Sequence, residues 1–284
     1  MLEFKNVTYV YGAGTPFEIK ALDDVSIKIE KGKVTGIIGH SGSGKSTLVQ
    51  LMNALYKPTS GTVLLNGEDI NKDAKTSHDT RFKVGLVFQY PEYQLFEETV
   101  GADIAFGPKN MGLSEGEVKD RVMRAARFTG LSEEILQRSP FELSGGQKRR
   151  CAIAGVIAMD PEVLVLDEPA AGLDPRGRSE ILGGLMEYRK RRGNSLVIVS
   201  HSMEDIAEYS DNIIALAKGK ILCSGTPHEV FSNFDILESS GLSLPEVTEV
   251  MHKLSKSGAN VNSSLYTVDE AFCELLPKVV KKNK

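Results

Sequence analysis

Nine residues near the start of the chain combine three glycines, three serines and a lysine. They follow the short apolar run Val34–Ile38 and precede a helix-forming segment. Their order fits G-x-x-x-x-G-K-[ST], the spacing of a phosphate-binding loop between a strand and a helix. Glycines let several backbone N–H groups point into one concavity, and the helix start adds a positive dipole end. We therefore predict a loop that binds a nucleoside triphosphate, made of Gly39, His40, Ser41, Gly42, Ser43, Gly44, Lys45, Ser46 and Thr47.

Two side chains of this loop have distinct predicted roles. Lys45 places a full positive charge beside the outer phosphates, and the Ser46 hydroxyl is a ligand for Mg²⁺. His40 contributes only its backbone N–H. The alternative is an ordinary glycine-rich turn, which is disfavoured because the lysine and the serine stand in register after a predicted strand.

A pair of carboxylates ends a second apolar run. Val163–Leu166 is predicted to be a buried strand, and Asp167 and Glu168 follow at its carboxyl end. In an open α/β sheet that edge lies beside the phosphate-binding loop. Asp167 can hold Mg²⁺ through water, and Glu168 can act as a general base on the attacking water. Alone, the pair could be a turn or helix-start feature; together with the loop it indicates hydrolysis.

A second anion-binding helix start follows about one hundred residues after the first. Its residues are Ser144, Gly145, Gly146 and Gln147, preceded by Leu143. A serine and two glycines that open a helix again present backbone donors to an anion. Two such loops with one pair of carboxylates are unusual in a single chain. The pattern makes sense if two chains face each other head to tail, each completing the other's nucleotide site.

Composition restricts the class of protein. The 284 residues are 41% hydrophobic and 25% charged, with a net charge of −4, which argues against a dedicated nucleic-acid binder. The three cysteines are far apart in the sequence, as expected of a reduced cytosolic protein. The N-terminus has no signal-peptide pattern, and the most apolar stretch, Ala152–Met159, is too short to span a bilayer.

Strand and helix patterns alternate along the chain, which predicts an α/β core with a parallel sheet. The early strands are expected to be antiparallel, residues 90–150 to form an inserted helical subdomain, and residues 227–284 a small C-terminal extension. The predicted strands are Leu2–Tyr9, Val25–Glu30, Val34–Ile38, Gly61–Leu65, Val84–Gln89, Val163–Asp167, Ser195–Ser200, Asn212–Ala217 and Lys220–Ser224. One predicted helix follows Lys45. The other predicted helices cover Ser114–Thr129, Gly145–Met159, Pro175–Arg192 and Met203–Tyr209.

The sequence LSGGQ, together with the phosphate loop and the carboxylate pair, resembles the signature of ABC-type ATPases. The resemblance runs from about Leu2 to Phe231. It implies a P-loop NTPase core of the RecA-like type, with a mixed, mainly parallel sheet, an antiparallel β subdomain and an inserted helical subdomain. It also implies ATP and Mg²⁺ as cofactors. By similarity, four further residues have roles: Tyr11 stacks on adenine, Gln89 reaches Mg²⁺ and the attacking water, Asp174 lies in the D-loop, and His201 is the switch histidine.

The segment Gln89–Val100 and the phrases Ala105–Asn110, Arg138–Glu142 and Cys151–Met159 resemble energy-coupling-factor importers, most closely their second, A-prime ATPase. The resemblance implies an ATP-hydrolysing subunit for import of a vitamin or transition-metal ion. Its implied partners are a second ABC ATPase, in a heterodimer, a transmembrane coupling protein that contacts residues 89–100, and small substrate-binding membrane proteins. It would act as a peripheral protein on the cytoplasmic face of the cell membrane, without nucleic acid. Residues 1–226 would form the nucleotide-binding domain, and residues 227–284 would contact the other ATPase.

Two other functions stay open: the ATPase of a binding-protein-dependent ABC importer, and a soluble ABC ATPase outside transport. Ala170, Ser200 and Ala54 depart from residues common in the family, but none of them removes a catalytic group. Tyr90, Tyr93, Leu95 and Phe96 could pack inside the protein; on the surface they would form a docking patch for a partner.

Overall fold

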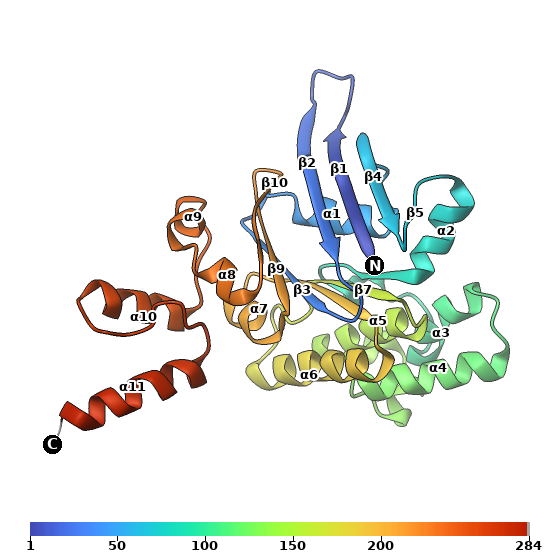
Figure 1. Cartoon of the computed structure of the whole chain (residues 1–284). Coiled ribbons are helices and arrows are strands. Elements are labelled where there is room, and N and C mark those ends of the chain that lie inside the picture. The colour runs from blue at the N-terminus through green and yellow to red at the C-terminus, as the bar shows by residue number, and fades with distance from the viewer. Residues whose placement is uncertain (283–284) are drawn as a thin grey trace.

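The computed structural model describes residues 1–282 and contains two sheets (Figure 1). The smaller sheet is antiparallel, has four strands and runs in the order β2-β1-β4-β5. Leu2 and Phe4 of β1 are buried, and Glu3 between them is more exposed, the alternation expected of a sheet with one face open to solvent. Its strands are β1 Leu2–Tyr11, β2 Ile19–Ile29, β4 Ser60–Leu65 and β5 Glu68–Asp69.

The larger sheet has six strands in the order β10-β9-β3-β8-β7-β6. All its neighbours are parallel except β10, which is antiparallel to β9. Every residue of β3, β6, β7 and β8 is buried, as expected of parallel strands covered on both faces. The parallel pairing brings the carboxyl ends of these strands to one edge. The strands are β3 Val34–Gly39, β6 Val84–Val87, β7 Val163–Asp167, β8 Ser195–Val199, β9 Asn212–Ala217 and β10 Lys220–Gly225.

Helices pack around the larger sheet, and the stretch of chain between β6 and β7 is entirely helices and loops. Three of the helices, α3, α4 and α5, pack on one another. Helices α3 and α4 and the start of α5 fall within residues 90–150, the segment predicted to be an inserted helical subdomain, and α5 continues beyond it to Ala158. The helices are α1 Lys45–Met52, α2 Ala74–Lys83, α3 Val100–Asn110, α4 Glu115–Phe128, α5 Gly145–Ala158, α6 Pro175–Arg192 and α7 Met203–Tyr209, with the short 3-10 helices η1 Pro91–Gln94, η2 Glu133–Gln137 and η3 Pro140–Glu142.

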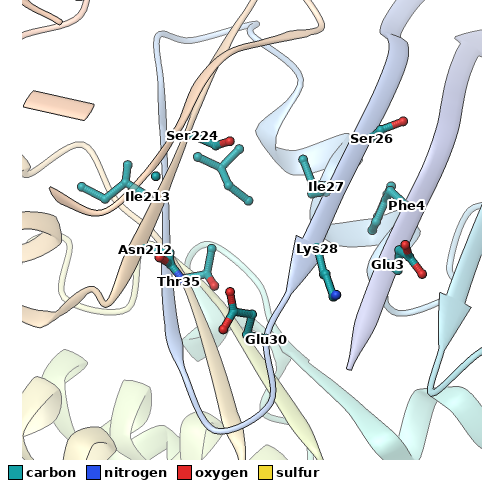
Figure 2. A pocket seen from close by; sticks show the side chains of 12 residues that line it. Glu3, Phe4, Ser26, Ile27, Lys28, Glu30, Thr35, Asn212, Ile213 and Ser224 are labelled. Atoms are coloured by element: carbon teal, nitrogen blue, oxygen red, sulfur yellow. The ribbon is translucent and has the colours of Figure 1, made fainter. Parts of the chain in front are cut away.

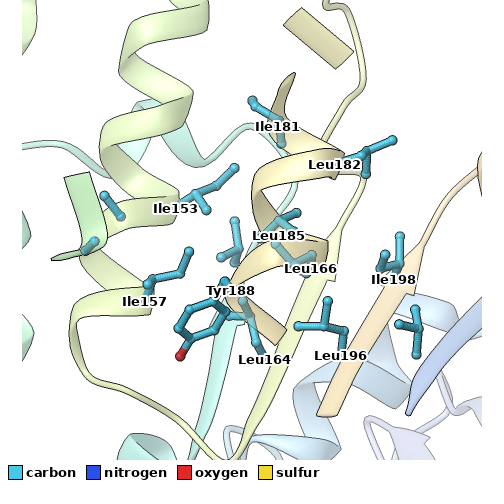
Figure 3. Packing of buried hydrophobic residues seen from close by; sticks show 14 of the residues in the cluster. Ile153, Ile157, Leu164, Leu166, Ile181, Leu182, Leu185, Tyr188, Leu196 and Ile198 are labelled. Atoms are coloured by element: carbon cyan, nitrogen blue, oxygen red, sulfur yellow. The ribbon is translucent and has the colours of Figure 1, made fainter. Parts of the chain in front are cut away.

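The main core lies where α5 and α6 pack against β7 and β8 (Figure 3). Ile153 and Ile157 of α5 face Leu185 and Tyr188 of α6, and all four are buried. The Tyr188 ring meets Phe128 edge-on, with ring centroids 5.2 Å apart. This packing fixes the start of α5 and the start of α6 relative to the sheet edge, where the predicted site residues lie.

Several predicted element bounds differ from the structure. The strand expected over Val84–Gln89 ends at Val87, because the chain turns sharply at Tyr90, whose φ of +55° is left-handed, just before a proline. The strand expected from Val25 begins at Ile19, where it pairs with the end of β1. Helix α2 was not predicted, since its sequence is polar and has no apolar period; the side chain of Asp73 caps it by accepting from the Thr76 N–H at 2.7 Å.

Four helices follow the last strand and extend to one side of the molecule, away from the helical segment (Figure 1). Val230, Phe231 and Leu237 are buried against the main core, which anchors the start of this region. The helices are α8 Pro227–Phe231, α9 Phe234–Ser239, α10 Glu246–Lys256 and α11 Val268–Lys282. The last two residues of the predicted extension, 283–284, lie outside the described part of the chain. Within residues 1–282 no helix has the length and apolar character needed to cross a bilayer.

A polar cleft of about 420 Å³ separates the edges of the two sheets (Figure 2). Strands β1, β2, β3, β9 and β10 line it, rather than the loops that carry the predicted ATP-site residues. Glu30 and Asn212 lie near Thr35, whose buried hydroxyl has no hydrogen-bond partner. The cleft is therefore a feature of the junction between the sheets and is separate from the candidate active site.

Candidate active site

The phosphate-binding loop joins β3 to α1 as the sequence predicted. Gly42 and Gly44 have φ values of +77° and +105°, the left-handed region that favours glycine. A Cβ on Gly44 would also stand 2.6 Å from the carbonyl oxygen of Ala21, so no other residue fits without movement. Helix α1 begins at Lys45, directly after this loop. The backbone N–H groups of its first turn have no partner within the helix, so they can bind an anion held by the loop.

Lys45 lies inside this loop and is buried. Its ammonium donates to the carbonyl oxygens of Gly39 at 2.6 Å and His40 at 3.1 Å. Burial lowers the pKa of Lys45, while the charges of Asp167 and Glu168 act in the opposite direction. The ammonium is thus held over the loop by two carbonyl groups, which arriving phosphate oxygens can replace.

Ser46 and Asp167 come together from two different elements. The Ser46 hydroxyl donates to Asp167 Oδ2 at 3.5 Å, across the gap between α1 and the end of β7. Burial raises the pKa of Asp167, and Lys45 and Ser46 lower it in part. A hydroxyl and a carboxylate at this separation are hard oxygen donors of the kind that Mg²⁺ prefers. Gln89 lies two residues beyond β6, whose end pairs with β7 beside Asp167, so the predicted metal-binding residues share one edge of the sheet.

Glu168 directly follows β7 and turns out of the sheet. Its φ is +54°, and its backbone N–H donates to the carbonyl of Val199 at 3.0 Å. Its Oε1 atom is buried, makes no hydrogen bond and lies 3.6 Å from Nε2 of His201. Burial and the neighbouring Asp167 raise the pKa of Glu168 to about 7. A carboxylate with this pKa can accept a proton from water near neutral pH, as a general base must.

His201 lies just beyond β8 and faces Glu168 across the sheet edge. Burial, and then the positive charge of Lys45, lower the pKa of His201, so the imidazole is neutral at pH 7. A neutral ring can donate one hydrogen bond and accept another. Lys45, Ser46, Asp167, Glu168 and His201 therefore form one charged cluster, which the sequence analysis assembled from separate motifs.

Tyr11 lies at the end of β1 and reaches α1. Its hydroxyl is 3.0 Å from Oγ1 of Thr47, and its ring meets Tyr9 and Tyr56 edge-on, with centroids 4.9 Å and 5.9 Å apart. Tyr11 is 37% exposed, so part of the ring is open to solvent beside the loop. Stacking on adenine stays a prediction.

The signature residues occupy the start of α5. Ser144 and Gln147 form a reciprocal capping box: the Gln147 N–H donates to the Ser144 hydroxyl at 3.3 Å, and the Ser144 N–H donates to Gln147 Oε1 at 3.1 Å. Ser144 and Gly145 are exposed, and a Cβ on Gly145 would meet nothing within 4 Å. Within residues 1–282 neither side chain of the box hydrogen-bonds to the phosphate-binding loop. The helix start is thus available to a group outside this chain.

Asp174, the predicted D-loop residue, caps α6. Its carboxylate accepts from the Gly177 N–H at 2.7 Å. One turn further along, Arg178 donates from Nε to Asp205 Oδ1 at 2.8 Å and also bonds to the hydroxyl of Ser202. Ser202 directly follows His201 and caps α7. Arg178 therefore holds the histidine loop against α6. Sequence reasoning missed this contact, because an arginine on an exposed helix face has no distinguishing pattern.

The aromatic segment after Gln89 lies on the surface. Tyr90, Tyr93 and Phe96 are 50%, 84% and 58% exposed, and Leu95 is half-buried against the main core. Beside them opens an apolar groove of about 360 Å³ between the sheet and the helical segment. Its apolar lining includes Leu55, Phe82, Leu86, Phe88, Leu95, Phe96, Phe106, Val156 and Met159. The structure thus favours a docking patch over internal packing for three of the four residues.

Comparison with known proteins agrees with this geometry. Residues 22–171 match the ABC transporter family. The chain is 52% identical over 276 residues to the energy-coupling factor transporter ATP-binding protein EcfA2 of Clostridium tetani, covering 97% of this chain and 96% of that one. The corresponding protein of Clostridium acetobutylicum is 51% identical over 276 residues, with the same coverage.

Solved structures show the same fold. The cbiO1 protein of Clostridium perfringens, described as part of the ABC transporter complex cbiONQ, superposes with a TM-score of 0.75 at 40% identity, over 88% of this chain and 98% of that one. A dimeric ATP-binding cassette in a post-hydrolysis state with ADP and Pi gives a TM-score of 0.72 at 30% identity, over 80% of this chain and 98% of that one. The predicted fold is confirmed, and the chain belongs to the ABC transporter ATPases, among the energy-coupling factor transporter ATP-binding proteins.

Proposed function

We propose that this chain is the ATP-hydrolysing motor subunit of an energy-coupling-factor importer. The observation that carries the proposal is the single sheet edge at which the phosphate-binding loop, Asp167, Glu168 and His201 converge, with Gln89 at the same edge and the apolar groove directly after it. Hydrolysis at the edge can therefore change the position of the segment that borders the groove. The relatives named for energy coupling support the same reading.

The residues of the chain divide the work of phosphoryl transfer, which depends on positioning and charge neutralisation. Lys45 and the backbone N–H groups at the start of α1 bind the outer phosphates. Ser46, Gln89 and Asp167 would hold Mg²⁺, whose charge neutralises the phosphate oxygens. Glu168 accepts a proton from the attacking water, and His201, 3.6 Å from it, orients the water and the terminal phosphate.

Each ATP site is completed by a second ATPase in a head-to-tail pair. The exposed start of α5 offers Ser144 and the N–H groups that follow it to a phosphate bound on the partner. Asp174 at the start of α6 lies at the same interface. A related cassette with ADP and Pi is described as dimeric, which supports this arrangement.

The C-terminal helices are a second contact between the two ATPases. Helices α10 and α11 leave Val250, Val268, Phe272 and Leu276 between 47% and 70% exposed. Both helices are amphipathic, so these side chains form apolar stripes on a region that extends away from the core (Figure 1). Residues 227–284 would thus hold the pair together while the nucleotide sites open and close, and residues 1–226 would form the nucleotide-binding domain.

The groove receives a helix of a transmembrane coupling protein. An amphipathic helix can place apolar side chains into a groove of this lining. Exposed Phe96 lines the groove, and exposed Tyr93 directly precedes Gln94, another lining residue. The complex would lie on the cytoplasmic face of the cell membrane, with small membrane proteins that bind a vitamin or a transition-metal ion as cargo. The relative described as part of the cbiONQ complex supports an assembly of this kind.

Purification of the tagged chain from membranes in mild detergent, followed by mass spectrometry, tests the function. We expect a second ABC ATPase, one coupling membrane protein and small membrane proteins in fixed ratios. Tyr93→Asp, which places a charge on the groove border, should release the membrane proteins and keep the second ATPase; Phe17→Asp, at an equally exposed residue of the β1–β2 hairpin, is the matched control. Recovery of two ordinary permease subunits with a soluble binding protein would instead support the binding-protein-dependent importer.

A further inference from the structure

Arg149 is a buried arginine on α5, five residues after the signature serine. It is only 4% exposed, although arginine is seldom buried unless its charge is paired. Its Nε and Nη2 atoms donate to the two carboxylate oxygens of Glu92, at 3.3 Å and 3.1 Å. Its Nη1 atom donates to the carbonyl oxygen of Ala171. One planar guanidinium thus bonds to two loops that are far apart in the sequence.

Both loops carry predicted active-site residues. Glu92 lies in η1, three residues after Gln89 and two before Gln94, which lines the apolar groove. Ala171 lies midway between Glu168 and Asp174, and its N–H donates to the carbonyl oxygen of Glu168 at 3.3 Å. The Arg149 side chain therefore links the segment after Gln89 to the turn that begins at the general base.

The chemistry of this contact is demanding. Arginine presents several donors in one rigid plane, so it can hold a carboxylate with two bonds and a carbonyl with a third. Lysine has one flexible ammonium and cannot reproduce this geometry. The Glu92 side chain is also largely buried, at 18% exposure, so removing either partner leaves a desolvated charge without its counterpart.

The next residue provides a natural comparison. Arg150 lies on the same helix and also forms an ion pair; its side chain is 16% exposed and that of its partner, Glu180, is 43% exposed. It bonds to Glu180 on α6 at 2.6 Å and to the carbonyl oxygen of Thr129 at 3.1 Å. Neither partner belongs to the loops around the nucleotide site. Arg150 therefore reports the stability effect of losing a paired, partly buried arginine on α5, without the effect on the site.

We propose that Arg149 is a positioning residue that makes the segment Gln89–Phe96 and the turn Glu168–Asp174 move as one unit. Its side chain bonds to Glu92 and to the carbonyl oxygen of Ala171, so it acts through these two loops. It acts by fixing Gln89 and Glu168 relative to each other, so that the ligand of the metal and the general base reach the terminal phosphate together. Because the end of the segment Gln89–Phe96 lines the groove, Arg149 would also pass motion of the Glu168–Asp174 turn to the groove. That effect on the groove rests on the proposed function, whereas the effect of Arg149 on hydrolysis does not.

Steady-state ATPase assays of the full-length chain test this proposal. The variants are Arg149→Met, Arg149→Lys, Glu92→Gln and the double variant Arg149→Met/Glu92→Gln, with Arg150→Met as the control and the melting temperature measured for each. We expect Arg149→Met, Arg149→Lys and Glu92→Gln to lower kcat at least tenfold, while KM for ATP changes less than about twofold. The kcat of the double variant should be no lower than that of the less active of its two single variants, because both substitutions break the same connection between the loops. Arg150→Met should keep kcat within threefold of the parent, even where its melting temperature falls equally.

Three outcomes would overturn the proposal. The first concerns the control. The proposal fails if Arg149→Met and Arg150→Met lower the melting temperature equally and also lower kcat equally relative to the unmodified chain. In the second, the fold loss of kcat in the double variant equals the product of the fold losses in the two single variants. Arg149 and Glu92 would then act independently. The third is a raised KM with kcat retained. If Arg149→Met does not fold, Glu92→Gln decides alone, and an unchanged kcat refutes the link. No membrane partner enters the assay, so its result and that of the purification are independent.

Discussion

Glu168→Gln should stabilise the nucleotide-free, metal-free chain at alkaline pH while it stops hydrolysis. Burial, with the nearby Asp167, raises the pKa of Glu168 from its usual 4.5 to about 7 in the folded chain. The unfolded chain therefore loses this proton at a lower pH than the folded chain does. Stability falls as pH rises from about 4.5, and the full penalty is present above about 7. Glutamine carries no charge, so the variant escapes the penalty.

The size of the effect follows from the shift in pKa. A rise of about 2.5 units corresponds to about 3 kcal/mol, at roughly 1.36 kcal/mol per unit. The carboxylate faces the open nucleotide site, where water can reach it, so we expect about 2 kcal/mol at pH 8.5. For a chain of this size that is a melting temperature about 3–6 °C higher than the parent's. At pH 5 the carboxyl group of the folded chain is protonated, and the two proteins should melt within about 2 °C of each other.

Thermal unfolding in EDTA, measured by circular dichroism between pH 5 and pH 8.5, tests this expectation. Glu238→Gln, at an exposed position on α9, is the matched control for the change from glutamate to glutamine. The reasoning is refuted if Glu168→Gln melts at or below the parent temperature at pH 8.5, or if its advantage is the same at pH 5. In separate samples without EDTA and with Mg²⁺ added, ATP should still bind, and turnover should fall by about 10²- to 10⁴-fold, the usual contribution of a general base.

Three further substitutions test other parts of the account. Ala54→Gly relieves a left-handed φ of +54° at a buried position and should raise the free energy of unfolding by about 0.5–1 kcal/mol in urea titrations; a loss of stability would show that the methyl group packs productively. Tyr188→Ala removes the largest fully buried side chain and should lower that free energy by about 3–5 kcal/mol; a loss under about 1 kcal/mol would mean that α6 is held by other contacts. Ser144→Arg should leave ATP binding at this chain's own loop intact and abolish hydrolysis at the partner's site in mixed dimers, as single-turnover assays would show; hydrolysis lost only at its own site would contradict the head-to-tail arrangement.

The sequence was sufficient for the parts of the fold that short patterns determine. The loop from Gly39 to Thr47 could be placed between a strand and a helix, because its glycines, lysine and serine stand at fixed spacing. The parallel sheet followed from apolar runs that alternate with helices, and the bounds of α6 and α7 were correct because proline, arginine and glycine mark the ends of α6 and Ser202 caps α7.

Other features depend on contacts between distant residues and could not be predicted. The raised pKa of Glu168 arises from burial at the meeting of two strands, which no local pattern describes. The pairing of Arg149 with Glu92 joins residues 57 positions apart. Helix α2 is mostly polar, so its existence depends on the cap at Asp73 and on packing against β6 rather than on apolar periodicity.

Site-specific photocrosslinking in native membranes tests the central claim most directly. A crosslinking amino acid replaces Tyr93 at the groove, and in a control chain it replaces Phe17; both residues are 84% exposed, so neither site is favoured by accessibility. We predict that Tyr93 forms an adduct with one polytopic membrane protein, in a yield that differs between ATP-bound and nucleotide-free membranes, and that Phe17 does not. An adduct from Tyr93 only with soluble or ribosomal proteins, or a membrane adduct whose yield ignores nucleotide, would contradict the claim that ATP hydrolysis on this chain drives a membrane importer through the groove.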